Sequence, residues 1–151
     1  MKIKKSVLLF LFMTCYIYNM AGNLKIDKAA TVSDINTTNK TATISFDISW
    51  ENSWRLSDGA SNYDGVWIFA RVQEKGTKEW QPVLFDTSVS DYGIGSNNGV
   101  EPAFSAGSTD NKCVGIFAFR KNNGKGNINW DGFKMKWNYE LNGIADINNI
   151  L

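Results

Sequence analysis

The residues that could carry out chemistry are few in this chain. The sequence contains no histidine, which is the commonest general base and the commonest zinc ligand in proteins. Hydrolytic sites that pair serine or cysteine with histidine are therefore excluded by composition. Of the two cysteines, Cys15 lies in an apolar N-terminal run and Cys113 opens an apolar segment, where we interpret it as a small buried residue. The sequence thus indicates a protein that is not an enzyme.

One loop collects oxygen-bearing side chains. Asp58, Asn62 and Asp64 precede Gly65, and calcium takes ligands of this kind. Their spacing differs from that of an EF-hand loop, and no glutamate closes the set. Asx turns explain the same residues as a structural corner. We favour the corner, and we expect neither a metal nor a cofactor.

Two pairs of acids have the residue types of a glycosidase, which needs two carboxylates at a set separation. These pairs are Glu51 with Asp58 and Asp86 with Asp91. Nothing in the sequence fixes either separation, so we interpret all four as surface acids.

Four aromatic residues are the candidate ligand-binding residues. Trp54, Tyr63 and Trp67 lie within one segment, and Trp130 lies in another predicted loop. Aromatic rings can stack on a sugar or a peptide, but they also fill cores. A core position is favoured for Trp67, whereas Trp54 and Trp130 lie outside the strongest strands. A carbohydrate-binding platform would require Trp54, Tyr63 and Trp130 to be exposed on one surface.

The elements that must position these residues are strands. Strict alternation over 41–50 predicts a half-buried antiparallel strand, and 133–139 alternates in the same way. Residues 66–73 and 113–120 are apolar on both faces, which is typical of central strands. Weaker strands are predicted at 24–32, 79–85 and 100–104, and Asn123-Gly124 predicts a hairpin turn over 121–126.

Six or seven short strands separated by turns predict an all-β protein: a two-sheet antiparallel β-sandwich, immunoglobulin/fibronectin-III-like. Residues 23–151 would form one such domain, with its last strand shortened or missing. Each sheet of a two-layer sandwich is covered on one face only. The two segments that are apolar on both faces therefore predict an exposed or poorly covered apolar patch around Trp67 or Phe69.

Residues 1–22 have the features of a secretory signal peptide. Basic residues at 2–5 precede an apolar run over 7–18, and small residues follow at Ala21 and Gly22. The run is too short to span a bilayer. An alternative is a lipid anchor at Cys15, although the residues before it lack the usual small side chain. We expect a secreted, periplasmic or cell-envelope protein.

The charge of the chain is nearly balanced. Of 16 basic and 15 acidic residues, Lys2, Lys4 and Lys5 fall in the predicted signal peptide, which leaves 13 basic against 15 acidic. No basic stripe remains to attract phosphates, so we expect no nucleic-acid partner. A protein or a carbohydrate remains as the partner of an aromatic surface.

Several short sequence words occur in a fixed order along the predicted domain: WENSWR at 50–55, NYDGVWIF at 62–69, Trp80, GIF at 115–117, Gly126-Asn127 and WNY at 137–139. In these words the chain resembles the N-terminal module of secreted Bacteroidetes proteins that carry a C-terminal domain like formylglycine-generating enzymes (sulfatase-modifying factors). No such enzyme domain follows here, so none of its catalytic or metal-binding residues can be transferred. The resemblance implies an exported, non-catalytic interaction or packing module, either truncated or free-standing. The alternative is a carbohydrate-binding module that uses loop aromatics.

Overall fold

The structure, a computed structural model, describes residues 22–59, 61–88, 92–109 and 112–150. Apart from Gly22, the predicted signal peptide, with Cys15, therefore lies outside the described residues. Asp91 also lies outside them. Within the described ranges, no helix combines the length and the hydrophobicity needed to cross a membrane.

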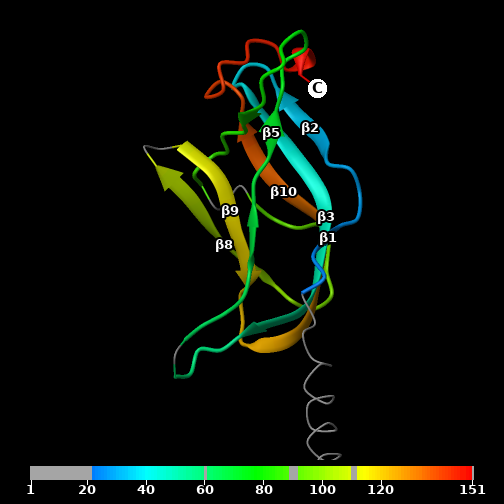
Figure 1. Ribbon diagram of the computed structural model, residues 1–151, viewed down its shortest axis with the longest axis vertical. Helices are drawn as coiled ribbons and strands as arrows, with labels where there is room; N and C mark the ends of the chain where they lie inside the picture. The colour runs from blue at the N-terminus through cyan, green and yellow to red at the C-terminus, as the bar shows by residue number, and fades with distance from the viewer. Residues whose placement is uncertain (1–21, 60, 89–91, 110–111, 151) are drawn as a thin grey trace, which may run out of the picture.

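Two long antiparallel strands form the centre of an all-β fold. β3 (Thr41–Arg55) and β10 (Gly124–Asn138) pair along their whole lengths, and Figure 1 shows them as a twisted ribbon running through the molecule. Three short strands extend this sheet. β1 (Lys25–Ile26) and β2 (Thr31–Asn36) both pair with β3, and β7 (Ser96–Asn97) pairs with β10.

A second antiparallel sheet lies across from this ribbon (Figure 1). It contains β4 (Val66–Ile68), β9 (Lys112–Arg120) and β8 (Pro102–Thr109), with β9 in the middle. A separate two-stranded sheet pairs β5 (Arg71–Val72) with β6 (Gln81–Pro82). All pairings between these strands are antiparallel.

The core lies between the two larger sheets. Phe133 on β10 meets Phe104 on β8 edge-on, with ring centroids 5.6 Å apart. Ile116 on β9 is fully buried, and Ile48 on β3 is nearly so. Along β3 the buried side chains occupy alternate positions, as Ile44, Phe46 and Ile48 do, so this sheet turns one apolar face towards the second sheet.

The predicted strand over 41–50 is confirmed, and β3 continues beyond it to Arg55. Its even-numbered residues from Ala42 to Trp50 are all buried, while the odd-numbered residues between them are partly exposed. The alternation in the sequence therefore gave the correct inward face.

Two predicted strands are each divided in the structure. The segment predicted as one strand over 24–32 contains β1 and the start of β2, which pair with different parts of β3. The segment over 66–73 is split into β4 and β5, which belong to different sheets. The prediction that 66–73 is a central strand is also wrong, because β4 lies at the edge of its sheet, next to β9.

The prediction of a hairpin over 121–126 is wrong. The strands on either side of this turn, β9 and β10, lie in different sheets, so the turn carries the chain from one layer to the other. An Asn-Gly pair indicates a tight change of direction. It does not determine whether the following strand pairs with the preceding one.

The strand predicted over 133–139 begins much earlier, at Gly124. Its pairing with β3 shifts register between Gly126 and Ile128 and again between Trp130 and Phe133. Such bulges change which residues face inward, so they interrupt the period of two on which the prediction depended. The part of β10 before Phe133 was therefore missed.

The remaining segments differ from prediction mainly in extent. The strand expected over 79–85 is reduced to β6, and the one expected over 100–104 is longer, as β8. After β10, the chain forms a short 3-10 helix, η2 (Ile147–Asn149), and Ile150 makes an isolated antiparallel bridge to Glu74.

Candidate functional site

The outer side of β4 and β9 carries aromatic side chains in register. Trp67 on β4 lies directly opposite Phe117 on β9. Their neighbours Ile68 and Ile116 are buried in the core, so Trp67 and Phe117 must point away from it. Trp67 is 49% exposed, and Phe117 is partly exposed. The core position favoured for Trp67 from the sequence is therefore wrong, because β4 turns this side chain away from the second layer.

Two glycines provide the surface on which these rings lie. A Cβ atom added at Gly115 would lie 2.5 Å from Cζ2 of Trp67, and one added at Gly65 would lie 2.7 Å from Cζ of Phe117. Any larger residue at either position would displace a ring. Each ring is thus packed against backbone on one side and remains accessible on the other, which limits its rotamer freedom before any binding.

A second stack continues the same surface. The rings of Tyr63 and Phe119 are nearly parallel, with centroids 4.5 Å apart, and Phe119 also contacts Phe117 at 5.6 Å. The guanidinium carbon of Arg55 lies 5.0 Å from the Tyr63 centroid and 5.2 Å from that of Phe119. This cation–π geometry fixes a positive charge beside the rings. Tyr63 is 41% exposed.

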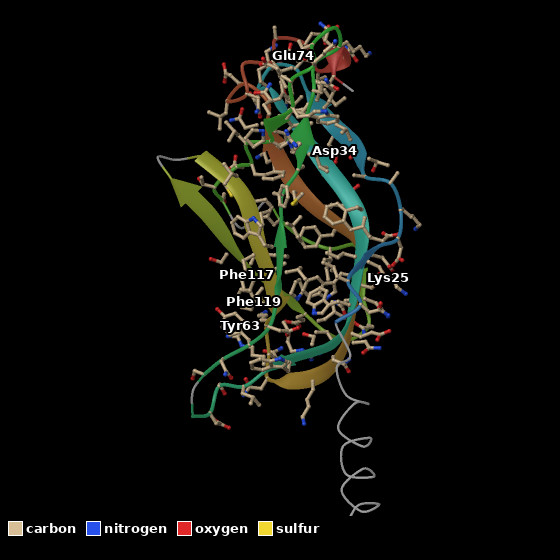
Figure 2. All side chains as sticks on the ribbon, in the orientation of Figure 1. Lys25, Asp34, Tyr63, Glu74, Phe117 and Phe119 are labelled. Atoms are coloured by element: carbon tan, nitrogen blue, oxygen red, sulfur yellow. The ribbon has the colours of Figure 1, made fainter. Side chains whose placement is uncertain are left out.

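We call this surface the aromatic face, defined by Arg55, Tyr63, Trp67, Phe117 and Phe119. Figure 2 labels three of these residues, Tyr63, Phe117 and Phe119, and shows them close together. Just beyond β4, Phe69 is 61% exposed. The predicted exposed apolar patch around Trp67 or Phe69 is therefore confirmed.

Asp64 attaches the aromatic face to the end of the central ribbon. Its carboxylate accepts hydrogen bonds from Trp50 Nε1 at 3.0 Å, from Ser53 Oγ at 2.9 Å and from the Trp54 backbone N–H at 2.8 Å. Its own N–H donates to the Trp54 carbonyl. The structural corner proposed for this loop is thus formed mainly by Asp64. Among the described residues, no group of three acid or cysteine side chains is arranged to hold a metal.

A buried arginine joins the same corner to the second sheet, and sequence reasoning did not identify it. Arg120 at the end of β9 donates from Nε to Ser53 Oγ at 3.3 Å and from Nη2 to the Gly126 carbonyl at 2.9 Å. Its own carbonyl accepts from Arg55 Nη1 at 2.9 Å. Both Arg120 and Ser53 are buried. The sequence feature that could have identified Arg120 is its position as a charged residue at the end of an apolar strand.

Trp130 is not a surface residue, which corrects its selection as a ligand-binding candidate. Its side chain is 0% exposed and packs edge-on against Trp50, with centroids 5.0 Å apart. Its Nε1 donates to the Val100 carbonyl at 2.8 Å. The residues around it resemble a loop in sequence, but they form part of β10, where Trp130 faces the core.

Trp54 lies on a different surface from Tyr63. It lines a shallow hollow of about 310 Å³ with Asn52, Leu56 and Lys125. Adjacent residues of a strand point to opposite faces, and Arg55, which stacks on Tyr63, follows Trp54 directly. The structure therefore does not bring Trp54, Tyr63 and Trp130 onto one surface.

The other candidates for chemistry lie apart from the aromatic face. Cys113 is fully buried, as predicted, and its thiol contacts the Gly115 carbonyl at 3.1 Å. Of the four acids considered as glycosidase pairs, Glu51 accepts a hydrogen bond from Asn23, Asp58 is exposed, and Asp86 accepts one from the Ser88 N–H.

An ion pair with perturbed pKa values lies at the edge of the larger sheet. Lys28 Nζ is 2.5 Å from Asp47 Oδ2, and the Gly132 N–H donates to Oδ1 at 2.8 Å. The hydrogen bond from Lys28, followed by that from Gly132, lowers the pKa of Asp47. The hydrogen bond to Asp47 in turn raises the pKa of Lys28. The pair attaches the segment between β1 and β2 to the central ribbon.

Comparison of the chain with protein-family models, with curated proteins and with solved structures finds no match in any of the three. The proposals below are therefore argued from the geometry and from the sequence.

Proposed function

We propose that this protein is an exported, non-catalytic module that binds a partner protein through the aromatic face. Its two facing sheets agree with a two-layer β-sandwich of the immunoglobulin or fibronectin type III kind. The N-terminal basic and apolar segments support export to the periplasm, the cell envelope or the medium.

One observation carries the binding proposal: Trp67 and Tyr63 are exposed although fixed in place by neighbouring residues. Tyrosine, tryptophan and arginine are the residues that most often dominate the binding energy of protein interfaces. Rings that are already ordered lose little rotamer freedom when a partner covers them. Arg55 adds a positive charge beside the rings, which could meet an acidic or aromatic group of the partner.

A protein is favoured over a carbohydrate by the arrangement of the rings. Tyr63 shares one of its faces with Phe119 and lies beside the Arg55 guanidinium, so less of its ring is free to stack on a sugar. Its plane is also tilted by 44° from that of Phe117. A carbohydrate ligand remains the alternative, and the experiment below distinguishes the two.

The resemblance to modules that precede enzyme-like domains supports a packing role. A domain attached to or associated with this module would cover the aromatic face in the way that a second layer covers a sheet. On this proposal the chain contributes binding, and any chemistry belongs to the partner.

Site-specific photo-crosslinking in the producing cell would test the proposal. A photoreactive phenylalanine analogue is placed at Trp67 and, as a matched control, at the similarly exposed Leu141. We expect a protein adduct from position 67 and not from position 141, and we expect Tyr63→Ser to reduce its yield. Equal adducts at both positions, or none at position 67, would refute a partner at this face.

The carbohydrate alternative has its own measurement. Electrophoresis of the protein through gels that contain soluble polysaccharides would show retardation if the aromatic face bound a sugar. Retardation that is lost in Trp67→Ser, without a protein adduct, would replace the proposed function by carbohydrate binding. Mass spectrometry of the exported protein tests the localisation separately, because cleavage should leave a chain that starts near Asn23.

A further inference from the structure

The inner face of β2 is only partly covered. Val32 on β2 lies opposite Ile44 on β3, so both side chains point to the same side of the sheet. Ile44 is buried, whereas Val32 is 42% exposed and Ile35 is 47% exposed. A hollow of about 430 Å³ adjoins them. We call it the β2–β5 groove; its lining includes Val32, Ile35, Ile44, Val72, Trp137 and Ile150.

The opposite wall of the groove is an edge of β5. Within the described residues, β5 has one strand partner, β6. The Ala70 carbonyl accepts from the Val83 N–H, so the backbone groups of Ala70 point towards the β6 side. Successive residues of a strand direct their backbone groups to opposite sides. The backbone groups of Arg71 and Gln73 therefore point to the other edge, towards the groove.

The chain itself occupies the first position on that edge. Ile150 forms an antiparallel bridge with Glu74, and the Lys75 N–H donates to the Asn149 carbonyl at 2.6 Å. Ile150 also lines the groove. Figure 2 labels Asp34 of β2 and Glu74, which lie at this end of the molecule. The bridge shows that this edge accepts a neighbouring strand and that the accepted direction is antiparallel.

We propose that the β2–β5 groove binds an extended segment of a partner protein, which adds as a strand to β5, antiparallel to it and in line with Ile150. Main-chain hydrogen bonds to Arg71, beyond the positions taken by the chain's own end, would hold the segment. Alternate side chains would point into the groove and cover Val32 and Ile35. Among the described residues of the lining, Arg71 is the one charged side chain, so the inward positions of the segment are uncharged and apolar.

This site is separate from the aromatic face, and the proposal goes beyond the proposed function. The groove is formed by β2, β5 and the inward side of the central ribbon, whereas the aromatic face lies on the outer side of β4 and β9. Either site could be occupied without the other, so variants can test them independently.

The first experiment fills the groove in cis. The full chain is extended after Leu151 by a segment with valine and threonine at alternate positions. A control extension carries aspartate in place of each valine. We expect the valine extension to raise the unfolding midpoint by roughly 5 °C. It should also slow amide exchange at Arg71 by at least about tenfold. Equal effects of the two extensions would overturn the proposal.

The second experiment offers the segment in trans. A fluorescein-labelled peptide with the same alternating valines is titrated into the unextended chain and followed by anisotropy. We expect saturable binding that Val32→Asp weakens at least about tenfold, or 1.4 kcal/mol. Trp67→Ser should leave this binding unchanged. The valine-extended chain should no longer bind the peptide, because its own segment occupies the groove.

Three results would overturn the partner-strand proposal. The first is absence of peptide binding, and the second is equal binding of a peptide with aspartate in place of valine. The third is self-association of the unextended chain that Val32→Asp abolishes, because it would assign the groove to a second copy of this chain. Val32 is exposed, so the substitution leaves the core unchanged, and circular dichroism verifies the fold of each variant.

Discussion

Tryptophans of β10 and of β4 have opposite environments. Trp130 and Trp137 on β10 are buried, whereas Trp67 on β4 is about half exposed. All three tryptophans lie on antiparallel strands, in which neighbouring side chains point to opposite faces of the sheet. The difference is the side of the strand that the second sheet covers: the inner face of β10 faces β8, while Trp67 lies on the outer side with Gly115 beneath it. The same residue type is thus structural in one region and available for binding in the other.

Removal of a buried tryptophan should have the largest effect. Trp130→Ala leaves a cavity beside Trp50 and leaves the Val100 carbonyl without its donor. We expect the free energy of unfolding to fall by about 3 to 5 kcal/mol, against about 1 kcal/mol or less for Trp67→Ala. Urea denaturation followed by far-ultraviolet circular dichroism measures both. Equal losses would contradict the distinction between a structural and a binding region.

Asp64 connects the two regions, and its loss should come next. Asp64→Ala removes the acceptor of three hydrogen bonds, from Trp50, Ser53 and the Trp54 backbone. We expect a loss of about 2 to 3 kcal/mol, because buried donors are left unsatisfied. The matched variant Asp58→Ala, in the exposed part of the same loop, should change stability by about 0.5 kcal/mol or less. A small loss for Asp64→Ala would mean that the corner is held mainly by Arg120.

The packing of the aromatic face itself can be tested at Gly115. In Gly115→Ala the added methyl group would lie 2.5 Å from the Trp67 ring and 2.9 Å from the Ile68 carbonyl. We expect a loss of about 1 to 2 kcal/mol and a Trp67 ring that quenchers reach more easily. Gly93→Ala is the matched control, because nothing lies within 4 Å of a Cβ atom there. If both variants behave alike, Trp67 does not rest on Gly115.

The smallest effect is expected at the ion pair of Lys28 with Asp47. This pair lies outside both the core around β10 and the aromatic face, so it provides a baseline for comparing the two. The pKa of Asp47 is lowered in the folded protein, chiefly by Lys28. The pair therefore contributes stability above the ordinary aspartate pKa of 3.8, and this contribution is lost as the pH falls through the lower folded value. The raised pKa of Lys28 implies a second loss, as the pH rises past 10.5 and through the folded value.

The unfolding midpoint, recorded against pH in Asp47→Asn and in the parent chain, measures this contribution. We expect the two curves to differ at neutral pH and to converge below about pH 3.8. Asp58→Asn, which changes an exposed acid, is the matched control and should leave the curve unchanged. A constant difference across the acid range would show that the negative charge of Asp47 does not account for its contribution to stability.

Much of the fold could be predicted where the period of two is unbroken. The strands at 41–50 and 113–120 and the exposed patch around Trp67 were predicted correctly, because side-chain alternation is a local property. The prediction was wrong at Trp130, where two bulges interrupt the period in a segment rich in asparagine and glycine. The hairpin at 121–126 was also wrong, because a turn signal does not specify a strand partner.

The candidate site could be predicted only in part. Tyr63 and Trp67 were identified as aromatic candidates, but their support by Gly65, Gly115 and Phe119 depends on pairing between strands far apart in the chain. Arg120 was not identified, since its partners Ser53 and Gly126 become neighbours only when the two sheets meet. The β2–β5 groove was missed for the same reason, because its walls come from several segments that are far apart in the chain.

The sequence by itself determined that this chain contains no histidine, that it is built of strands, and which side of β3 is apolar. These properties follow from composition and from residues that are adjacent in the chain. The tertiary structure decided which strands pair and therefore which tryptophans are buried. Pairing brings together residues 50 or more positions apart, as Trp67 with Phe117, and depends on the packing of whole faces that no local pattern encodes.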